Sequence, residues 1–435
     1  MQTASKKVIN GWAMYDWANS VYNLVITTTF FPIYYTEMTK AAPFNGTVTF
    51  MGRHFVNTAL YNYALAAAYL LVAFTLPILT SIADYKGNKK RFMQFFCYMG
   101  AISCSCLYFF NKENFSFGII CMMLAAIGFY GSLVFYNSYL PEIAAVKDRD
   151  RISARGFSFG YMGSVLMQLF GFALVLFYNK IPFLKNEGDA VRLTFLLVGL
   201  WWVGFAQITF ARLPKSKAAA EDIDNDKNIF TGGFMELKKV FWQVMKMQVM
   251  KRFLTAFFFY NMGVQTVMLA ATNFGSKVLN LPSTKLIITV VIIQLVAIAG
   301  AYFISRLSAR FGNLQVLIIV VVFWIAVCIF GYLMQTEYHF YGLAIAVGLV
   351  MGGIQSLSRS TYSKLMPETK DTASFFSFYD ITEKVAIVIG LSSFGYIEEL
   401  TGSMRNSVLA LIVFFALGLF FLFFALSKQK QIATT

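Results

Sequence analysis

Three charged residues lie close together inside a long apolar stretch near the end of the chain. Within "FSFYDITEKVAIVIG", residues 376–390, they are Asp380, Glu383 and Lys384. Asp380 and Lys384 are spaced i, i+4 in the favourable acid-before-base order, so they can neutralise each other on one helical face. Glu383 then has no local partner, and a lone carboxylate in a low dielectric tends to take up a proton. This pattern predicts a group that can bind and release a proton.

The same three residues fit three other arrangements. Lys384 could bridge both acids, or it could bind an anionic group such as a carboxylate. The three side chains could also form a satisfied ion cluster that only ties their helix to a neighbouring helix. Which arrangement occurs depends on how the surrounding helices place the three side chains.

The composition of the chain is that of a membrane protein. Its 435 residues are 58% hydrophobic and only 13% charged, whereas soluble proteins carry about 25% charged residues. Apolar runs recur along the chain, each long enough to cross a hydrocarbon core of roughly 30 Å as a helix. We therefore predict an all-α integral membrane protein with twelve transmembrane helices, at residues 15–37, 57–83, 92–110, 117–140, 155–178, 191–212, 252–273, 284–308, 314–334, 340–364, 374–397 and 404–427.

The distribution of basic residues predicts the orientation. Most of the 36 Lys and Arg fall at the termini and in the loops that follow even-numbered spans. The positive-inside rule places this side in the cytoplasm, so we expect a multi-pass protein of the cell inner membrane with both termini cytoplasmic. The net charge of +15 then reports topology, not nucleic-acid binding. The five cysteines lie in apolar runs and the two histidines in predicted loops, so we expect no metal, cofactor or disulfide framework.

A long connection divides the predicted spans into two sets of six. Residues 214–250 begin with a polar stretch and continue as "FMELKKVFWQVMKMQ", which is amphipathic and basic. Such a segment is expected to lie along the membrane surface. We predict an N-terminal six-helix bundle over 1–213, a cytoplasmic linker with an amphipathic helix over 214–250, and a C-terminal six-helix bundle over 251–435.

The two sets share short motifs in the same order. "YNSYLPE", ending at Glu142, corresponds to "YSKLMPE", ending at Glu368, and "FSF" occurs at both 157–159 and 376–378. The nearly constant spacing indicates a duplicated six-helix unit. Many secondary transporters are built from such repeats, with the substrate site between the halves. Two six-helix halves with both termini inside point to the major facilitator fold.

The loop "TSIADYKGNKKR", from Thr80, resembles the major facilitator signature between helices 2 and 3. Asp84, Gly87 and Lys89 match its core, whereas the second copy has Ala309 where the acid would stand. The resemblance implies that Asp84 and the basic cluster make cytoplasmic contacts that latch an outward-open state. Alternatively, these charges only mark the inner face and end the helix.

Three further segments resemble one branch of this superfamily. They are "WAMYDWANSVYNLVITTTFFPIYY", "FFFYNMGVQTV" and "GGIQSLSRSTYSKLMPE". The branch contains the fungal autophagy-related vacuolar amino-acid effluxers and their bacterial relatives, and amino-acid efflux is the role implied for the fungal members. Relatives often carry Asp where this chain has Asn261.

Polar residues inside the predicted spans recur at helical spacing. Asp16, Asn19 and Asn23 follow one helical face, and two further pairs are spaced i, i+4. Ionisable groups in lipid usually face the bundle interior or a wet cavity. We assign substrate or coupling roles to Asp16, Asn19, Asn23, Asn261, Gln265, Gln355, Asp380, Glu383 and Lys384. We assign a cytoplasmic gate to Asp84, Gly87, Lys89 and Arg359.

Each assignment has a structural alternative. Asp16 lies in the first turn of its predicted span, where a carboxylate favours the helix N-terminus. The amide side chains could form hydrogen bonds between helices, as we expect for the isolated Gln294. Arg359 could be an anchor that extends to the membrane surface.

The sequence therefore predicts a secondary active transporter of a small solute, with amino acids or related metabolites as candidates. We expect alternating access, efflux, protons as a candidate coupling ion, and a monomer. Symport and antiport stay open. The alternative is a membrane-embedded enzyme or receptor-like protein on the same scaffold. An enzyme is not expected, because the predicted spans contain no histidine and the chain has no Walker-type phosphate loop.

Overall fold

The fold is described by a computed structural model that covers residues 2–215 and 229–434. Its N-terminal half contains α1 (Lys6–Val21), the π-helix η1 (Tyr22–Phe30), α2 (Phe31–Lys40), α3 (Asn57–Lys86), α4 (Lys89–Cys106), α5 (Phe115–Ser138), α6 (Leu140–Ile143), α7 (Arg149–Leu176) and α8 (Glu187–Arg212). Its C-terminal half contains α10 (Gln248–Leu279), α11 (Ser283–Phe311), α12 (Asn313–Leu333), α13 (Glu337–Leu365), α14 (Thr372–Thr401) and α15 (Met404–Thr434). Between them lies α9 (Ile229–Lys246).

Shorter elements join the long helices. Three 3-10 turns are η2 (Leu107–Phe109), η3 (Val146–Asp148) and η4 (Tyr178–Lys180). A hairpin of β1 (Thr47–Phe50) and β2 (Arg53–Val56) follows α2, with Thr47 paired to Val56 and Phe50 to Arg53 in the antiparallel register.

Ten helical segments of the described chain are long and apolar enough to cross a membrane. They coincide with ten of the twelve predicted spans. The other two predicted spans, 15–37 and 374–397, are also helical, as the run α1–η1–α2 and as α14. The π-helical segment interrupts the first, and the charges within 380–384 lower the hydropathy of the second. The all-α prediction is confirmed apart from the small β-hairpin.

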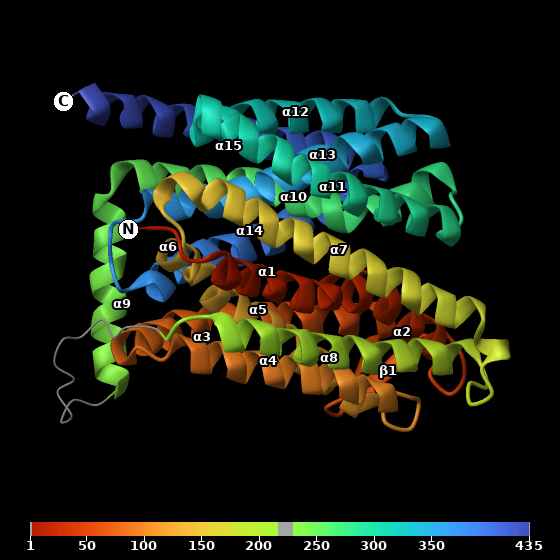
Figure 1. Ribbon diagram of the computed structural model, residues 1–435. Coiled ribbons are helices and arrows are strands. Elements are labelled where there is room, and N and C mark those ends of the chain that lie inside the picture. Colours follow the sequence, from red (N-terminus) through yellow and green to blue (C-terminus); the bar gives the residue numbers. More distant parts are fainter. Residues whose placement is uncertain (1, 216–228, 435) are drawn as a thin grey trace.

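The helices form two groups that lie side by side (Figure 1). Helices of the N-terminal half pack mainly on one another, and so do α10 to α15. The two groups meet through α7, which packs on α11 and α13, and through α14, which packs on α3 and α5. Whether each group is a separate domain stays a prediction.

Glycines allow one sharp turn and one close helix crossing. Gly87 ends α3 with φ of 64°, and its N–H donates to the carbonyls of Ala83 and Asp84. This left-handed conformation favours glycine and caps many helices. A Cβ on Gly128 would lie only 2.4 Å from the Cα of Gly100, so these two glycines let α4 and α5 approach closely.

The two ends of the helices differ. The chain termini and α9 lie at one end (Figure 1), together with the turns at 87–88, 144–148 and 366–371. We call this the basic end, because it is the side at which the basic residues gather. The opposite end carries β1 and β2 and is called the hairpin end.

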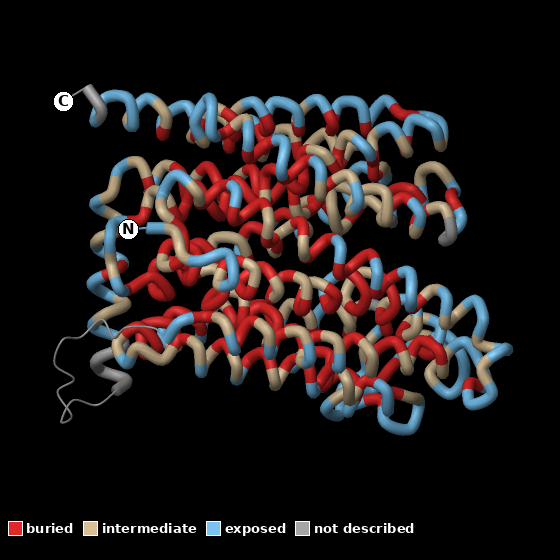
Figure 2. Tube along the Cα trace, viewed as in Figure 1, coloured by how far each residue is buried: buried red, intermediate tan, exposed pale blue. Residues whose placement is uncertain are grey.

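The outer surface is apolar along much of its length. Figure 2 shows buried residues concentrated between the helices and exposed residues along the outer helices. Large side chains such as Phe74, Phe303 and Phe423 are more than half exposed on these faces. Extended exposed apolar surface marks contact with an apolar environment such as lipid.

The predicted amphipathic segment forms α9, which runs across the basic end (Figure 1). It packs mainly on α3 and buries Val240 and Val244, while Trp242 on the outer side is 55% exposed. The polar stretch 216–228 of the predicted linker lies outside the described residues.

Candidate functional site

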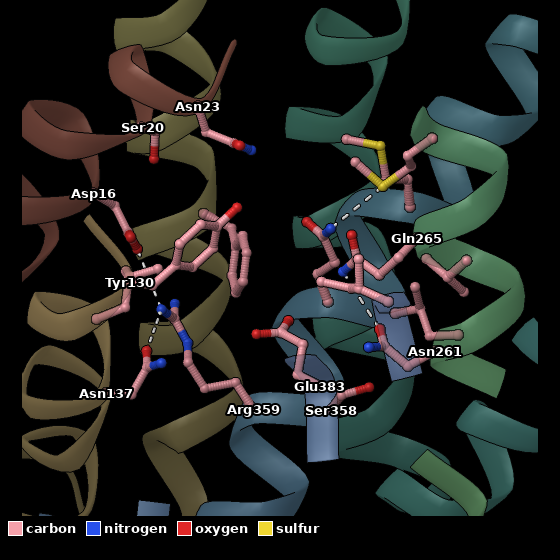
Figure 3. Close-up of a pocket in the computed structure, with 18 of the residues that line it drawn as sticks. Asp16, Ser20, Asn23, Tyr130, Asn137, Asn261, Gln265, Ser358, Arg359 and Glu383 are labelled. Carbon is pink, nitrogen blue, oxygen red and sulfur yellow. Dashed lines mark hydrogen bonds and ion pairs between the residues drawn. The ribbon is translucent and has the colours of Figure 1, made fainter. Parts of the chain in front are cut away.

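A cavity of about 170 Å³ lies between the two halves. Its walls come from α1, η1, α5 and α7 on one side and from α10, α11, α13 and α14 on the other (Figure 3). Of the predicted substrate or coupling residues, those that line the cavity are Asp16, Asn23, Asn261, Gln265, Gln355, Glu383 and Lys384, and the predicted gate residue Arg359 joins them. Asn19 and Asp380 are buried but do not line it.

On the C-terminal wall, Lys384 binds both neighbouring acids. Its Nζ lies 2.7 Å from Glu383 Oε2 and 3.3 Å from Asp380 Oδ1. The expectation that Glu383 lacks a local partner is therefore wrong, because the flexible lysine side chain reaches back to the adjacent residue. Lys384 also crosses to the other half, where its Nζ lies 4.5 Å from the ring centre of Tyr130.

From the same C-terminal wall, Arg359 of α13 inserts into the N-terminal half (Figure 3). Its Nη1 lies 3.3 Å from Asp16 Oδ2 and donates to Asn137 Oδ1 at 3.1 Å. Its Nε donates to the Ser153 hydroxyl and its Nη2 to the Ser153 carbonyl, at 3.0 and 2.9 Å. The side chain is 3% exposed, so Arg359 is a buried contact between the halves and not a surface anchor.

Asp16 is held from several sides. It accepts a hydrogen bond of 2.7 Å from the Tyr136 hydroxyl in addition to its ion pair with Arg359. The helix begins at Lys6, so Asp16 lies about three turns into it and not in the first turn as expected. A Cβ on Gly156 would lie 2.6 Å from Asp16 Oδ2 and 2.9 Å from Arg359 Nη2. The missing side chain of Gly156 therefore makes room for this ion pair.

Amide side chains complete the cavity. Gln355 accepts a hydrogen bond of 2.7 Å from the hydroxyl of Tyr161 across the two halves. Gln265 donates to Asn261 Oδ1 at a long 3.4 Å. Among the described residues, Asn261 Nδ2 and Gln294 Oε1 are buried without a hydrogen-bond partner. Gln294, for which we expected hydrogen bonds between helices, lines the cavity and leaves its Oε1 without a partner.

Several site residues were missed in the sequence. Asn137 lies in the repeated "YNSYLPE" motif, and Tyr130, Ser153 and Tyr161 lie on helices that line the cavity. The repeat could have drawn attention to Asn137. Nothing local distinguishes the tyrosines from the many aromatic residues that face lipid.

A first group of polar contacts joins the halves at the basic end. Asp84 accepts hydrogen bonds from the Ser374 N–H at 2.7 Å and the Ser374 hydroxyl at 2.8 Å, at the N-terminus of α14. A carboxylate at this position interacts favourably with the helix dipole. Lys89, placed by the turn at Gly87, donates to Thr372 at 2.6 Å. We call this group the Asp84 seam.

The Asp84 seam contains a buried ion network. Lys89 Nζ lies 3.9 Å from Asp84 Oδ1 and also pairs with Glu142, which in turn accepts a hydrogen bond from Thr372. The side chains of Asp84 and Lys89 are at most 1% exposed. Three of the four predicted gate residues are thus together at this seam, although their gating role stays a prediction.

A second group, the Asp150 seam, joins α7 to the C-terminal half. Asp150 Oδ2 lies 2.6 Å from Lys364 Nζ and accepts a hydrogen bond of 2.9 Å from Ser308. Its Oδ1 accepts a hydrogen bond of 2.8 Å from Asn313. Nothing in the sequence singles out these residues, because the acid is one of several charges near a helix start.

The polar contacts at the hairpin end have a different character. Lys277 pairs with Glu398 at 3.0 Å, and Arg405 donates to the carbonyl of Tyr332 at 2.6 Å, both within the C-terminal half. Every cross-half hydrogen bond described above lies at the cavity or nearer the basic end. The arrangement can therefore keep the cavity closed toward the basic end.

The described residues contain no group of three or more His, Cys, Asp or Glu side chains that could hold a metal ion. The charged cavity residues are ion-paired, and amides and aromatic rings surround them. This chemistry suits reversible binding of a small polar molecule.

Comparisons with solved structures identify the fold. The chain matches FucP, the Escherichia coli fucose:proton symporter, in the outward conformation with a TM-score of 0.70 at 13% identity, over 97% of this chain and 99% of that one. It matches the proton:xylose symporter XylE with a TM-score of 0.68 at 12% identity, over 96% and 94%. At this identity the likeness shows the fold alone, which is the major facilitator fold of multi-pass membrane proteins.

Comparisons of sequence identify the family. The family model described as "Vacuole effluxer Atg22 like" matches residues 4–434. An uncharacterised MFS-type transporter of Bacillus subtilis, YxiO, is 33% identical over 95% of this chain and 94% of that protein. Autophagy-related protein 22 of Kluyveromyces lactis is 25% identical over 95% and 92%. The chain therefore belongs to the Atg22-like family of major facilitator transporters.

Proposed function

We propose that this protein moves a small polar solute through the central cavity by alternating access, as a secondary transporter and not as an enzyme. The observation that carries the proposal is the cavity between the two halves, closed by the Asp84 and Asp150 seams toward the basic end. Opening that end requires both seams and the Asp16–Arg359 pair to separate. A rocking motion of the halves would separate all three together.

We place the basic end in the cytoplasm, in accordance with the positive-inside rule. The described conformation is then closed to the cytoplasm, and the protein is a monomer of the cell inner membrane. The name of the family model, vacuole effluxer, supports efflux as the direction. Amino acids or related metabolites are the candidate solutes.

We also propose that transport is coupled to protons. Asp380, Glu383 and Lys384 together carry one negative charge when all are ionised. Uptake of one proton would make this cluster neutral, which lowers the cost of moving it within a low dielectric. Glu383 is the acid of this cluster that a proton can reach from the cavity, because it lines the cavity and its side chain is 24% exposed, whereas that of Asp380 is 5% exposed.

A reversible cross-link tests alternating access. The hydroxyls of Ser81 and Ser374 lie 3.3 Å apart across the Asp84 seam, so the sulfurs of a Ser81→Cys/Ser374→Cys pair would lie close enough to be tested for a disulfide. In proteoliposomes, oxidation should abolish solute flux and reduction should restore it. Each single cysteine variant is the control for oxidation itself. Flux that persists after complete disulfide formation would contradict alternating access.

A pH gradient tests the coupling separately. Flux of the solute should respond to an imposed gradient in the wild type and lose that response in Glu383→Gln. Glu37→Gln is the matched control, because Glu37 is an exposed carboxylate outside the cavity. A gradient response retained by Glu383→Gln would rule out Glu383 as the coupling group.

A further inference from the structure

We infer that the cavity selects an organic cation, a solute with one ammonium group and no carboxylate, and that this solute and a proton compete for the negative charge at Glu383. The inference rests on the proposed function, because it takes the central cavity as the transport site. Of the candidate solutes named there, it favours related metabolites that carry an amine without a carboxylate over the amino acids themselves.

The site carries one net negative charge when its acids and bases are ionised. The charged residues that line the cavity are Asp16, Arg359, Glu383 and Lys384, and Asp380 is bound to Lys384. Three acids and two bases leave one net negative charge. A single positive charge on a solute would neutralise the site, whereas a zwitterion would not change its net charge.

Among the described residues that line the cavity, neither cation is free to pair with a carboxylate of the solute. The guanidinium of Arg359 donates to Asp16, Asn137 and Ser153. The ammonium of Lys384 is held between its two neighbouring acids. A carboxylate on the solute would have to displace an acidic side chain of the protein from its ion pair. The fold already holds that acid beside its partner.

The carboxylate of Glu383 can accept an ammonium group from the cavity. The carboxylate of Glu383 points into the cavity between Arg359 and Gln265 (Figure 3). One of its oxygens accepts a hydrogen bond from Lys384, and the partly exposed carboxylate can accept a further hydrogen bond from a solute N–H.

The aromatic lining favours the same ligand. Faces of aromatic rings attract cations, and the rings that line this cavity are Phe129, Tyr130, Phe157, Tyr161, Phe257, Tyr260 and Tyr379. Two of them already lie against cations of the protein, Tyr130 at 4.5 Å from Lys384 Nζ and Phe157 at 4.2 Å from the guanidinium carbon of Arg359. The unpartnered amide atoms of Asn261 and Gln294 can bind a hydroxyl or amide elsewhere on the solute.

Competition with a proton follows from the single charge. The groups around Glu383 are Lys384 and Asp380 on its own helix, Arg359 on α13 and Asp16 on α1, together with the phenols of Tyr69, Tyr130, Tyr260 and Tyr379. The phenols are neutral near pH 7, and the two bases are paired with acids. One negative charge remains uncompensated, so the site binds either a proton or an ammonium group but not both. The resulting exchange moves one organic cation one way and one proton the other, with no net charge transfer.

A matched series of three probes tests the inference. Phenethylamine, phenylalanine and 3-phenylpropionate share one aromatic body and carry a positive, a zwitterionic and a negative charge. In calorimetry on the purified protein, the amine should bind at least about tenfold more tightly than the zwitterion, and the anion more weakly still. Amine affinity should fall as the pH is lowered, with proton release on binding at the lower pH. Equal or tighter binding of phenylalanine overturns the inference, as does an affinity that does not change with pH.

Variants locate the charge and separate this inference from the proposed function. Glu383→Gln should lower amine affinity about tenfold or more and remove its pH dependence, Glu383→Asp should restore part of both, and Glu37→Gln should change neither. If Glu383→Gln does not fold, the wild-type probe series and the proton release still decide. Transport of phenylalanine without binding of the amine overturns this inference alone, whereas amine binding with no flux of any probe overturns the proposed function.

Discussion

The internal repeat relates the two seams at the basic end. Nevertheless, the buried acid does not lie on equivalent helices in the two seams. In the Asp84 seam the acid lies at the end of α3, and the N-terminus of α14 donates to it. In the Asp150 seam the acid lies in the first turn of α7, and Ser308 and Asn313 at the α11–α12 turn donate to it. Because α3 corresponds to α11 and α7 to α14, the duplicated elements have exchanged donor and acceptor.

The difference shows what duplication conserved and what it did not. Both turns keep a glycine with positive φ, at Gly87 and Gly312. The position equivalent to Asp84 is Ala309, which is exposed, while Ser308 beside it is buried in the seam. Each seam has one buried acid that receives the donors of the other half, Asp84 or Asp150, whereas Glu142 in the Asp84 seam is 25% exposed. The lysine of the Asp84 seam is also the more deeply buried of the two, because Lys89 is 1% exposed and Lys364 21%.

The largest effect is expected for Asp84→Ala. It removes the acceptor of the α14 N-terminus and one partner of a buried lysine, at a cost of about 3 kcal/mol to the closed state. A reporter cysteine at Ser377, which is buried in α14 just beyond the seam, should then react roughly a hundredfold faster with a membrane-impermeant thiol reagent. Asp148→Ala, at the same end but bonded within one half, should leave the labelling rate unchanged.

The exchange of roles is tested by Ser308→Asp. A carboxylate here would face Asp150, whose Oδ2 now lies 2.9 Å from the Ser308 hydroxyl. Repulsion should cost the closed state about 2 kcal/mol and speed the same labelling reaction. Ala309→Asp is the matched control and should have little effect, because Ala309 is exposed. A larger effect at Ala309 than at Ser308 would show that the two seams do not differ as described.

A smaller effect is expected at the turn that the two copies share. Gly87→Ala would place a side chain on a residue with φ of 64°, at a cost of about 1 kcal/mol. Its position next to the Asp84 seam should raise the labelling rate severalfold. A Gly87→Asn variant, which tolerates this conformation better, should lie between alanine and the wild type.

The smallest effect concerns α9, which reaches only the Asp84 seam. Lys239 bridges Glu236 and Asp371, at 2.7 and 3.3 Å. Burial lowers the pKa of Lys239, but the hydrogen bond to Glu236 and the charge of Asp371 outweigh it and raise its pKa above the ordinary value. The contact is therefore fully present at neutral pH and is lost only as the pH rises through that raised pKa. Because Lys239 is 53% exposed, Lys239→Ala should change labelling by no more than about twofold. A change as large as that of Asp84→Ala would make α9 a principal part of the gate.

The sequence by itself determined the helices and their duplication. Apolar runs of sufficient length must form helices in lipid, because each backbone group has to bond within its own segment. The span predicted at 374–397 thus recurs as α14 over Thr372–Thr401, and the loop after Thr80 forms the turn that presents Asp84. These are local properties, and local sequence is enough to predict them.

Only the tertiary structure decided which charges meet. Arg359 pairs with Asp16 across 343 positions of sequence, and Lys384 binds Glu383 as well as Asp380. Likewise, helix rotation alone places Ser308 in its seam and leaves Ala309 exposed. These outcomes depend on how distant helices pack, since a long side chain in a low dielectric takes the partner that packing brings within reach.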